Sequence, residues 1–383
     1  MRIGIVGTSW PYRGGLAAFN ERLAQQFMAE GHEVEIFTFT LQYPDFLFPG
    51  KTQYSDTQKP AGLSIRRTMN SINPFSWYKT ARAIHKARID LIVIKFWIPL
   101  MAPCLGTIAR LARRRGIQVV SILDNVIPHE PHFWDKWLIR YFVRSVDRFV
   151  AMSESVKEDC LRFLPNCRKD CVALSPHPLY DNFGEPVPKA EARKTLGLPA
   201  DKTILLFFGF IRDYKGLDLL MRAYAKAIKQ QTSNIKHNDL LLVVAGEFYN
   251  NAQQYSELEK ELGLEGAISW HTDFIPDDKV RYYFSAADLI VQPYKSATQS
   301  GVTQIAYHFE KPMLVTDVGG LAEIVPDGKV GYVCEVNEAS VADAIERFMA
   351  IDPKERENVF TKNIQLEKQK YAWSRMTNVI LNK

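Results

Sequence analysis

Two cationic side chains, Arg212 and Lys215, follow a short apolar run in the stretch FFGFIRDYKGLDLL at residues 207–220. The apolar run is typical of a buried strand, and the residues after the lysine have the spacing of a helix. Because the helix dipole favours acids at a helix N-terminus, two cations there indicate a bound dianion such as a diphosphate. The alternative is solvated surface charge, paired with Asp213 or Asp218.

Glycines and a serine at other predicted strand ends could supply backbone N–H groups to the same anion. Gly14 and Gly15 open the first predicted helix, where free N–H groups and the helix dipole favour an anion. Ser300 is a candidate N-cap, Gly301 lets a ligand approach the backbone, and the N–H groups of residues 300–303 could form a second cradle. An ordinary turn explains each feature equally well when it is taken singly. A Gly-x-Gly-x-x-Gly dinucleotide motif does not follow the first strand.

A polar cluster follows the predicted strand at 117–123. It contains Asp124, Asn125, His129 and Glu130. Such a cluster could orient a substrate hydroxyl or accept its proton. The alternative is a proline turn that is capped by Asp124.

The elements that position these residues form two series of alternating strands and helices. The first series has strands at 2–7, 32–39, 90–96, 117–123 and 148–152, with helices at 15–30, 75–88, 103–115 and 132–146. The second has strands at 203–209, 239–246, 267–272, 288–294 and 312–318, with helices at 216–231, 252–262, 277–286 and 300–309. Four prolines within residues 175–189 predict a linker between them. The sequence therefore predicts the α/β class, with two Rossmann-like domains whose parallel sheets bind ligands at their carboxyl edges.

Charge is unevenly distributed along the 383 residues. The chain carries +5 overall, but residues 1–175 alone hold 24 Lys and Arg against 15 Asp and Glu. Aromatic residues are mixed into this basic half, which suits an anionic membrane surface as well as it suits half-buried core aromatics. No nucleic-acid-binding motif and no membrane-spanning stretch is found. The odd count of five cysteines indicates reduced thiols, and no signal-peptide pattern is seen. A cytoplasmic protein is expected, with contact to the inner face of the cell membrane left open.

The order and spacing of several stretches resemble the retaining nucleotide-sugar glycosyltransferases of the GT-B fold, of the family 4 or group 1 type. The stretches are RGGLAAF, DNVIPHE, AMSESVKED, FFGFIRDYKGLDLL, VAGEFY, FIPDDKVRYYFSAADLIVQPY and TDVGGLAEIVPDGKVGYV. The resemblance covers nearly the whole chain.

The resemblance implies the domain arrangement and the activity. Residues 1–176 would bind the acceptor, residues 177–369 would bind the nucleotide sugar across a facing cleft, and a helix at about 370–383 would pack back on the first domain. The expected reaction moves a hexose from a UDP- or GDP-sugar to a glycan or lipid-linked acceptor with retained configuration, in cell-surface polysaccharide or glycoconjugate synthesis. No cofactor and no metal is expected, since cations and a helix N-terminus would take the metal's place.

The resemblance also implies roles for individual residues. Arg212 and Lys215 would bind the donor diphosphate and stabilise its developing charge, with Asp124 and His129 as further catalytic residues. Gly15 would approach the same phosphates from the opposite domain. The expected donor-binding residues are Gly14, Gly15, Gly246, Glu247, Phe274, Ile275, Gln299, Ser300, Gly301, Val302 and Gln304.

Two departures from the family pattern stand out. The family has two glutamates eight positions apart that contact the sugar and the ribose, and here those positions hold Ala297 and Ile305, near Gln299 and Gln304. A position often held by histidine is Asp124. Two other interpretations therefore stay open. A nucleotide-sugar epimerase would need carboxylate acid–base pairs, and a degenerate nucleotide-sugar-binding protein would need no catalytic groups.

Overall fold

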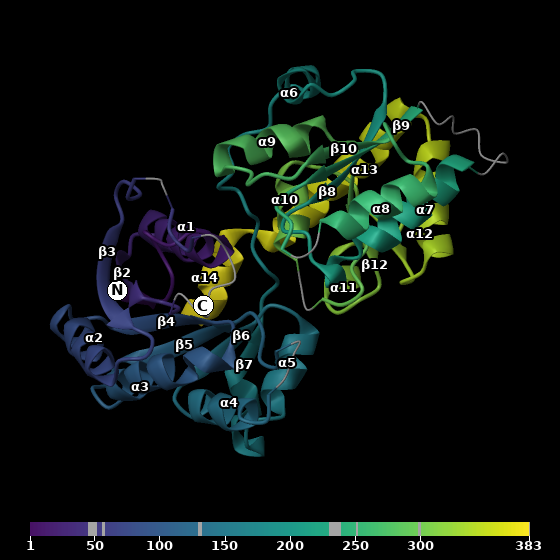
Figure 1. Cartoon of the computed structure of the whole chain (residues 1–383). Helices are drawn as coiled ribbons and strands as arrows, with labels where there is room; N and C mark the ends of the chain where they lie inside the picture. Colours follow the sequence, from purple (N-terminus) through teal and green to yellow (C-terminus); the bar gives the residue numbers. More distant parts are fainter. Residues whose placement is uncertain are drawn as a thin grey trace. The chain divides into compact units, whose positions relative to one another are not determined.

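The computed structural model describes residues 1–44, 52–55, 58–128, 132–229, 239–249, 252–297 and 300–382. The chain divides into two compact units, each with its own parallel sheet (Figure 1). Unit 1 comprises Met1–Pro178 and Ala372–Lys383, and unit 2 comprises Leu179–Tyr371.

Unit 1 contains a seven-stranded sheet in the order β3-β2-β1-β4-β5-β6-β7, all of whose pairs are parallel. Its strands are β1 (Arg2–Val6), β2 (Glu33–Leu41), β3 (Ser64–Asn70), β4 (Leu91–Phe96), β5 (Gln118–Leu123), β6 (Arg148–Ala151) and β7 (Val172–Leu174). Its helices are α1 (Gly15–Ala29), α2 (Pro74–Lys86), α3 (Ala102–Arg113), α4 (Asp135–Val143), α5 (Glu154–Leu161) and α14 (Trp373–Leu381), with short 3-10 turns at η2 (Pro99–Met101) and η3 (Asn166–Cys171). The strand order reverses between β1 and β4, as in a Rossmann-like fold.

Both faces of the unit 1 sheet are covered, and β4 shows how its sequence achieves this. Ile92 and Ile94 pack into one apolar cluster, whereas Leu91 and Val93 pack into a second cluster. Successive side chains of a strand point to opposite faces, so an uninterrupted apolar run is buried on both sides. Lys95 interrupts this run at the register of Leu91 and Val93, so it points to the face that α1 covers.

The last helix, α14, packs against α1 within unit 1 (Figure 1). Thr377 donates a hydrogen bond from Oγ1 to Glu30 Oε1 at 2.6 Å. The guanidinium of Arg148 donates to the carbonyl of Val379 at 2.8 Å, near the C-terminal end of the helix. A cation at this end complements the helix dipole, which together with these bonds fixes α14 on unit 1.

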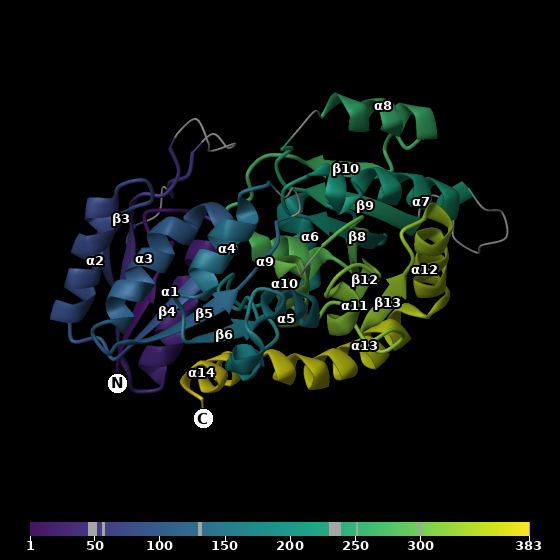
Figure 2. The ribbon, with the colours of Figure 1, turned by 90° about the horizontal axis from the view of Figure 1, so that it is seen from below.

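Unit 2 contains a six-stranded parallel sheet in the order β10-β9-β8-β11-β12-β13, which is again the Rossmann order. Its strands are β8 (Thr203–Phe208), β9 (Leu240–Ala245), β10 (Ile268–His271), β11 (Leu289–Gln292), β12 (Met313–Thr316) and β13 (Gly331–Cys334). Its helices are α6 (Lys189–Leu196), α7 (Leu217–Lys229), α8 (Gln253–Leu262), α9 (Asp277–Ala286), α10 (Gly301–His308), α11 (Leu321–Ile324), α12 (Glu338–Ala350) and α13 (Pro353–Glu367), with 3-10 turns at η4 (Asp213–Lys215) and η6 (Lys368–Tyr371). Figure 2 shows α12 lying beside α7.

The predicted α/β class with two Rossmann-like units is confirmed. The structure adds β3, β7 and β13, and the helices α5, α6, α12 and α13, which the sequence analysis left unassigned. In the ranges that the structure describes, no helix is both long and apolar enough to cross a bilayer.

Candidate active site

The turn that connects β8 to α7 carries Arg212 and Lys215. Both residues precede α7, and a one-turn 3-10 helix, η4, separates the arginine from the first residue of α7. The turn is tied to the neighbouring strand end, because Ile211 N–H donates to the carbonyl of Glu247 at 2.8 Å and Ile211 accepts from Tyr249 N–H at 3.0 Å. The two cations therefore sit at the carboxyl edge of the unit 2 sheet, where α/β proteins bind ligands.

Two glycines permit this close-packed turn. A Cβ at Gly216, whose φ is +68°, would lie 2.0 Å from the carbonyl oxygen of Pro293. A Cβ at Gly246, whose φ is +139°, would lie 2.4 Å from the carbonyl oxygen of Gly209. No other residue fits either position, so Gly246 is required by the backbone around the site.

Arg212 is half-buried and lies over an aromatic ring. Its guanidinium carbon is 4.0 Å from the ring centroid of Tyr249, which fixes the plane of the guanidinium. Its Nε is buried and has no hydrogen-bond partner among the described residues. A buried donor without a partner is uncommon in folded proteins and indicates a position that a ligand can satisfy.

Lys215 points back over the end of β8. Its Nζ would lie 3.1 Å from a Cβ at Gly209, and it is 5.7 Å from the ring centroid of Tyr294. Burial, followed by repulsion from Arg212, lowers the pKa of Lys215 to about 8. The protein thus holds two like charges close together, which is unfavourable unless an anion joins them.

Arg212 and Lys215 do not form the alternative surface ion pairs with Asp213 or Asp218. Asp218 binds Lys295 at 2.7 Å, and Asp213 accepts a hydrogen bond from Gln254 at 3.4 Å. In the described part of the chain, neither Arg212 nor Lys215 has an acid within ion-pairing distance. The pair is therefore not neutralised by the protein.

The N-terminus of α10 is the second element of this edge. Ser300 is its N-cap, and its Oγ accepts from Val302 N–H at 3.2 Å and contacts Tyr294 Oη at 3.2 Å. The cap occupies the Val302 N–H, so the other N–H groups of the first turn remain as donors for an anion. A Cβ at Gly301 would lie 2.7 Å from the Tyr180 ring, which explains the glycine there. Gln299 lies outside the described residues.

The positions at which the family has glutamates are apolar and packed. Ile305 is buried, and the half-buried Ala297 packs against the same core. The neighbouring Gln304 is fully buried, and neither of its amide atoms has a partner in the described residues. In this structure its amide is enclosed, so its role in donor binding stays a prediction.

The remaining expected donor contacts lie at the ends of β9 and β10. Glu247 follows β9 and is half-buried. Phe274 is 47% exposed, while Ile275 packs partly against the unit 2 core. A half-exposed aromatic ring at a strand end is able to cover a nucleotide, and that role also stays a prediction.

In unit 1, the loop between β1 and α1 is braced by side chains. Glu21 Oε1 accepts from Ser9 Oγ at 2.8 Å and from Trp10 N–H at 2.7 Å. Gly14 is the N-cap of α1 without a side-chain cap, and Gly15 is exposed with no acid in the first turn. A helix N-terminus without an acidic side chain is a position that favours an anion, and the role of Gly14 and Gly15 in donor binding stays a prediction.

Asp124 has an unexpected partner at the carboxyl edge of the unit 1 sheet. Its Oδ1 lies 2.9 Å from Nζ of Lys95, a lysine on β4 that is only 2% exposed. Lys95 Nζ also lies 3.3 Å from the ring centroid of Phe19 on α1. Burial lowers the pKa of Lys95, and the charge of Asp124 opposes that shift. Asp124 is therefore held in an ion pair. His129 and Glu130 lie outside the described residues.

His177 completes what we name the Lys95 cluster, made of Phe19, Lys95, Asp124 and His177. Its ring lies 5.2 Å from that of Phe19, and its Nδ1 is 2.7 Å from the carbonyl oxygen of Pro178. Burial and the nearby Lys95 lower its pKa to about 3, so the imidazole is neutral. Lys95 and His177 were missed from the sequence, although a lysine inside an apolar strand was a usable signal.

Among the described residues, no group of three or more His, Cys, Asp and Glu side chains is arranged to hold a metal ion. The expectation that the reaction needs no metal is not tested by this finding.

Comparison with known proteins identifies the family. Residues 188–366 match the family model described as Glycosyl transferases group 1, and residues 13–173 match Glycosyltransferase Family 4. A D-inositol 3-phosphate glycosyltransferase of Saccharomonospora viridis is 30% identical over 246 residues, which cover 63% of this chain and 56% of the relative. The chain spans about half the length of the first such curated relatives.

Solved structures share the fold across the whole chain. A sucrose-phosphate synthase from Thermosynechococcus elongatus has a TM-score of 0.73 at 18% identity, covering 100% of this chain and 97% of that one. The Anabaena protein HepE in complex with UDP has a TM-score of 0.75 at 15% identity, covering 100% and 99%. The two family models together show that the chain belongs to the group 1 and family 4 glycosyltransferases, and the likeness to the solved structures shows that it has their GT-B fold.

Proposed function

We propose that the chain is a retaining hexosyltransferase that moves a sugar from a UDP- or GDP-sugar to a hydroxyl of a glycan or lipid-linked acceptor, in the synthesis of a cell-surface polysaccharide or glycoconjugate. One observation carries this proposal. Arg212 and Lys215 stand at a ligand-binding sheet edge without an acidic partner in the described residues. The diphosphate of a nucleotide sugar supplies the two negative charges that this pair lacks.

The same two cations act on the leaving group. As the bond between the sugar and the diphosphate breaks, negative charge grows on the phosphate oxygen, and a fixed cation stabilises that charge more than the ground state. By analogy with a single oxyanion donor, each cation lowers the free-energy barrier of the reaction by about 2–4 kcal/mol. A bound diphosphate also raises the lowered pKa of Lys215 and so keeps the ammonium charged during the reaction.

Retention follows if the acceptor hydroxyl attacks from the face that the diphosphate leaves. The departing phosphate oxygen then accepts the hydroxyl proton, and no pair of nucleophilic carboxylates is required. Asp124 and His129 are the residues of unit 1 that we assign to orienting the acceptor. Lys95 would fix the direction of the Asp124 carboxylate through the 2.9 Å contact between them, and its charge opposes the rise in the pKa of Asp124 that burial causes.

We propose that Arg212 and Lys215 supply the positive charge that a metal ion would otherwise supply, so that transfer should proceed in the presence of a chelator.

UDP-glucose is the first donor to test, because the similar Anabaena protein was solved with UDP-glucose. The relatives that act on inositol phosphate support a hydroxyl acceptor in general terms.

The aromatic residues of the basic half divide into two groups in the structure. Phe96 and Phe142 are core residues, but Phe133 is 75% and Trp137 63% exposed. Exposed arginines accompany this group: Trp137 and Arg140 lie on α4, Phe133 precedes the helix and Arg144 is its C-cap. Aromatic rings beside arginines suit the headgroup region of an anionic bilayer, which supports peripheral contact with a membrane that holds a lipid-linked acceptor.

The proposal is tested by incubating the purified chain with a panel of UDP- and GDP-sugars and following the products by nuclear magnetic resonance. Slow release of a free sugar with the donor's anomeric configuration is expected, with and without a chelator. An epimerised donor would instead identify an epimerase. Binding without any turnover, even with acceptor sugars present, would identify a nucleotide-sugar-binding protein.

A further inference from the structure

A polar cavity lies in unit 2, at the end of the sheet opposite to Arg212 and Lys215. It has a volume of about 510 Å³ and is lined at the amino ends of three strands, at Thr203 as the first residue of β8, Asp288 before β11 and Pro312 before β12. The start of α13 and residues of α6 close its sides. We call it the amino-edge cavity. Its size is that of a small-molecule site.

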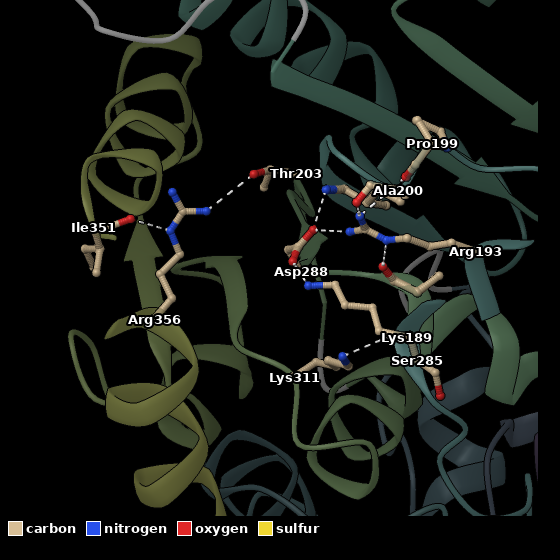
Figure 3. Close-up of polar contacts among 12 residues, drawn as sticks. Lys189, Arg193, Pro199, Ala200, Thr203, Ser285, Asp288, Lys311, Ile351 and Arg356 are labelled. Carbon is tan, nitrogen blue, oxygen red and sulfur yellow. Dashed lines mark hydrogen bonds and ion pairs between the residues drawn. The ribbon is translucent and has the colours of Figure 1, made fainter. Parts of the chain in front are cut away.

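One side of the cavity is a neutralised network. Arg193, which is 5% exposed, donates to Asp288 Oδ2 at 2.7 Å, and Lys189 binds the other oxygen of the same carboxylate (Figure 3). Arg193 further donates to the carbonyls of Ala286 and Ala200. This network ties α6 to the start of β11, so it is explained as structure.

Arg356 on α13 is different, because no carboxylate of the described residues lies within ion-pairing distance of its buried guanidinium, and Asp288 and Asp352 act on it only from farther away. It is 8% exposed, and its guanidinium lies 4.7 Å from the ring centroid of Phe348. Its hydrogen bonds go to the carbonyls of Ile351 at 2.6 Å and Met349 at 2.8 Å, and weakly to Thr203 Oγ1 at 3.4 Å. Figure 3 shows it apart from the network around Asp288. Carbonyls at the end of α12 offset only part of a full charge, so a buried cation here favours an anion.

The other charges around the cavity increase this preference. The cationic lining residues are Lys189, Arg193, Lys202, Lys311, Lys354 and Arg356, whereas the acidic ones are Asp201, Asp288 and Glu310. Asp288 is shared by two cations, and Glu310 is bound by Lys368. Lys202 and Lys354 have no ion pair within the described residues. The cavity is therefore positive, and Phe309 and Phe348 give it an apolar wall.

We propose that the amino-edge cavity binds the phosphoryl group of a small phosphorylated metabolite. The phosphoryl group would lie between Arg356 and Lys311, with Lys202 and Lys354 at the rim, since several donors from different elements suit its oxygens. The rest of the metabolite would lie along the apolar wall. This site does not depend on the proposed transferase activity.

Calorimetric titration of the full chain with inorganic phosphate and with glucose 6-phosphate, at constant ionic strength, tests the proposal. The main variant is Lys202→Ala/Lys354→Ala, because Arg356 also caps α12 and its loss could unfold the unit. The matched control is Lys226→Ala/Lys260→Ala, which removes two exposed lysines that do not line the cavity. A Lys215→Ala variant removes the other anion site.

Both probes should bind, and the main variant should weaken binding about tenfold, since hydrogen bonds to charged groups are lost. The control should bind as the parent does, and Lys215→Ala should retain the component of binding that the main variant weakens. Tighter binding of glucose 6-phosphate than of phosphate would identify a whole metabolite as occupant, and equal binding would identify free phosphate. The proposal is overturned if neither probe binds, if both double variants weaken binding equally, or if Lys215→Ala abolishes it.

Discussion

Replacing Lys215 by methionine should weaken diphosphate binding while making the folded protein more stable. Methionine keeps most of the packing of the lysine stem over Gly209 but removes the charge. The pKa of Lys215 is lowered to about 8 in the fold, so the ammonium form is disfavoured by folding. Since the unfolded chain binds the proton more tightly, this residue's contribution makes stability rise as the pH rises from about 8 towards the ordinary lysine pKa. Below that window the charged lysine costs folding on the order of 1–3 kcal/mol, after allowance for its partial exposure.

The same substitution should weaken the binding of UDP, although it stabilises the folded protein. A hydrogen bond to a charged group contributes about 1.5–3 kcal/mol, so loss of the ammonium should raise the dissociation constant for UDP about 10- to 150-fold. Calorimetry with UDP measures this change, and urea unfolding at neutral pH measures the gain in stability. Lys226→Met, on an exposed position in the last turn of α7, is the matched control and should change neither quantity.

If Lys215→Met binds UDP as tightly as the parent chain, the ammonium group does not bind the diphosphate. If the variant is destabilised to the extent seen for a broken salt bridge, the lysine has a partner in the folded state and its charge is not unfavourable for folding.

Three further predictions concern other parts of the molecule. Lys95→Met should destabilise unit 1 by about 3–5 kcal/mol in urea unfolding, because it removes the charge of Lys95 from the carboxylate of Asp124, whose side chain is only 19% exposed, and adding Asp124→Asn should recover part of the loss. Gly246→Ala should cost more than about 1–3 kcal/mol, since its Cβ would meet a backbone oxygen at 2.4 Å; an unchanged unfolding midpoint would show that the turn can relax. Phe133→Ser/Trp137→Ser should abolish salt-sensitive flotation with phosphatidylserine vesicles without lowering the melting temperature, and flotation equal to that of the parent would exclude these rings as the contact.

Much of the fold could be predicted because the central strands are apolar on both faces. β9 is an unbroken apolar run and β4 is interrupted only by Lys95, and these two runs located the sheets and the edges at which ligands bind. The edge strand β3 was missed because its sequence, SIRRTMN, is mostly polar and half-exposed. Its pairing with β2 depends on tertiary contacts, which cannot be predicted from the residues of β3 alone. By contrast, α12 has a regular apolar stripe and could have been predicted.

The candidate site was predictable only in part, for a related reason. Arg212 and Lys215 directly follow strand β8, so their position at the sheet edge could be predicted from the residues next to them in the sequence. The Lys95 cluster joins α1, β4, the end of β5 and the segment before Pro178, and no local pattern connects these four places. The pairing of Asp218 with Lys295, which leaves Lys215 without an acid, depends likewise on the fold.

The central claim is that Arg212 and Lys215 stabilise the diphosphate as it leaves. The most direct measurement is the turnover number for UDP release from a UDP-sugar at saturating donor, in the parent chain, in Arg212→Ala and in Lys215→Ala. The account predicts that each variant lowers kcat about 100-fold or more, because the lost interaction is stronger in the transition state. Variants that raise KM but leave kcat unchanged would contradict it, since the cations would then bind the donor without acting on the reaction.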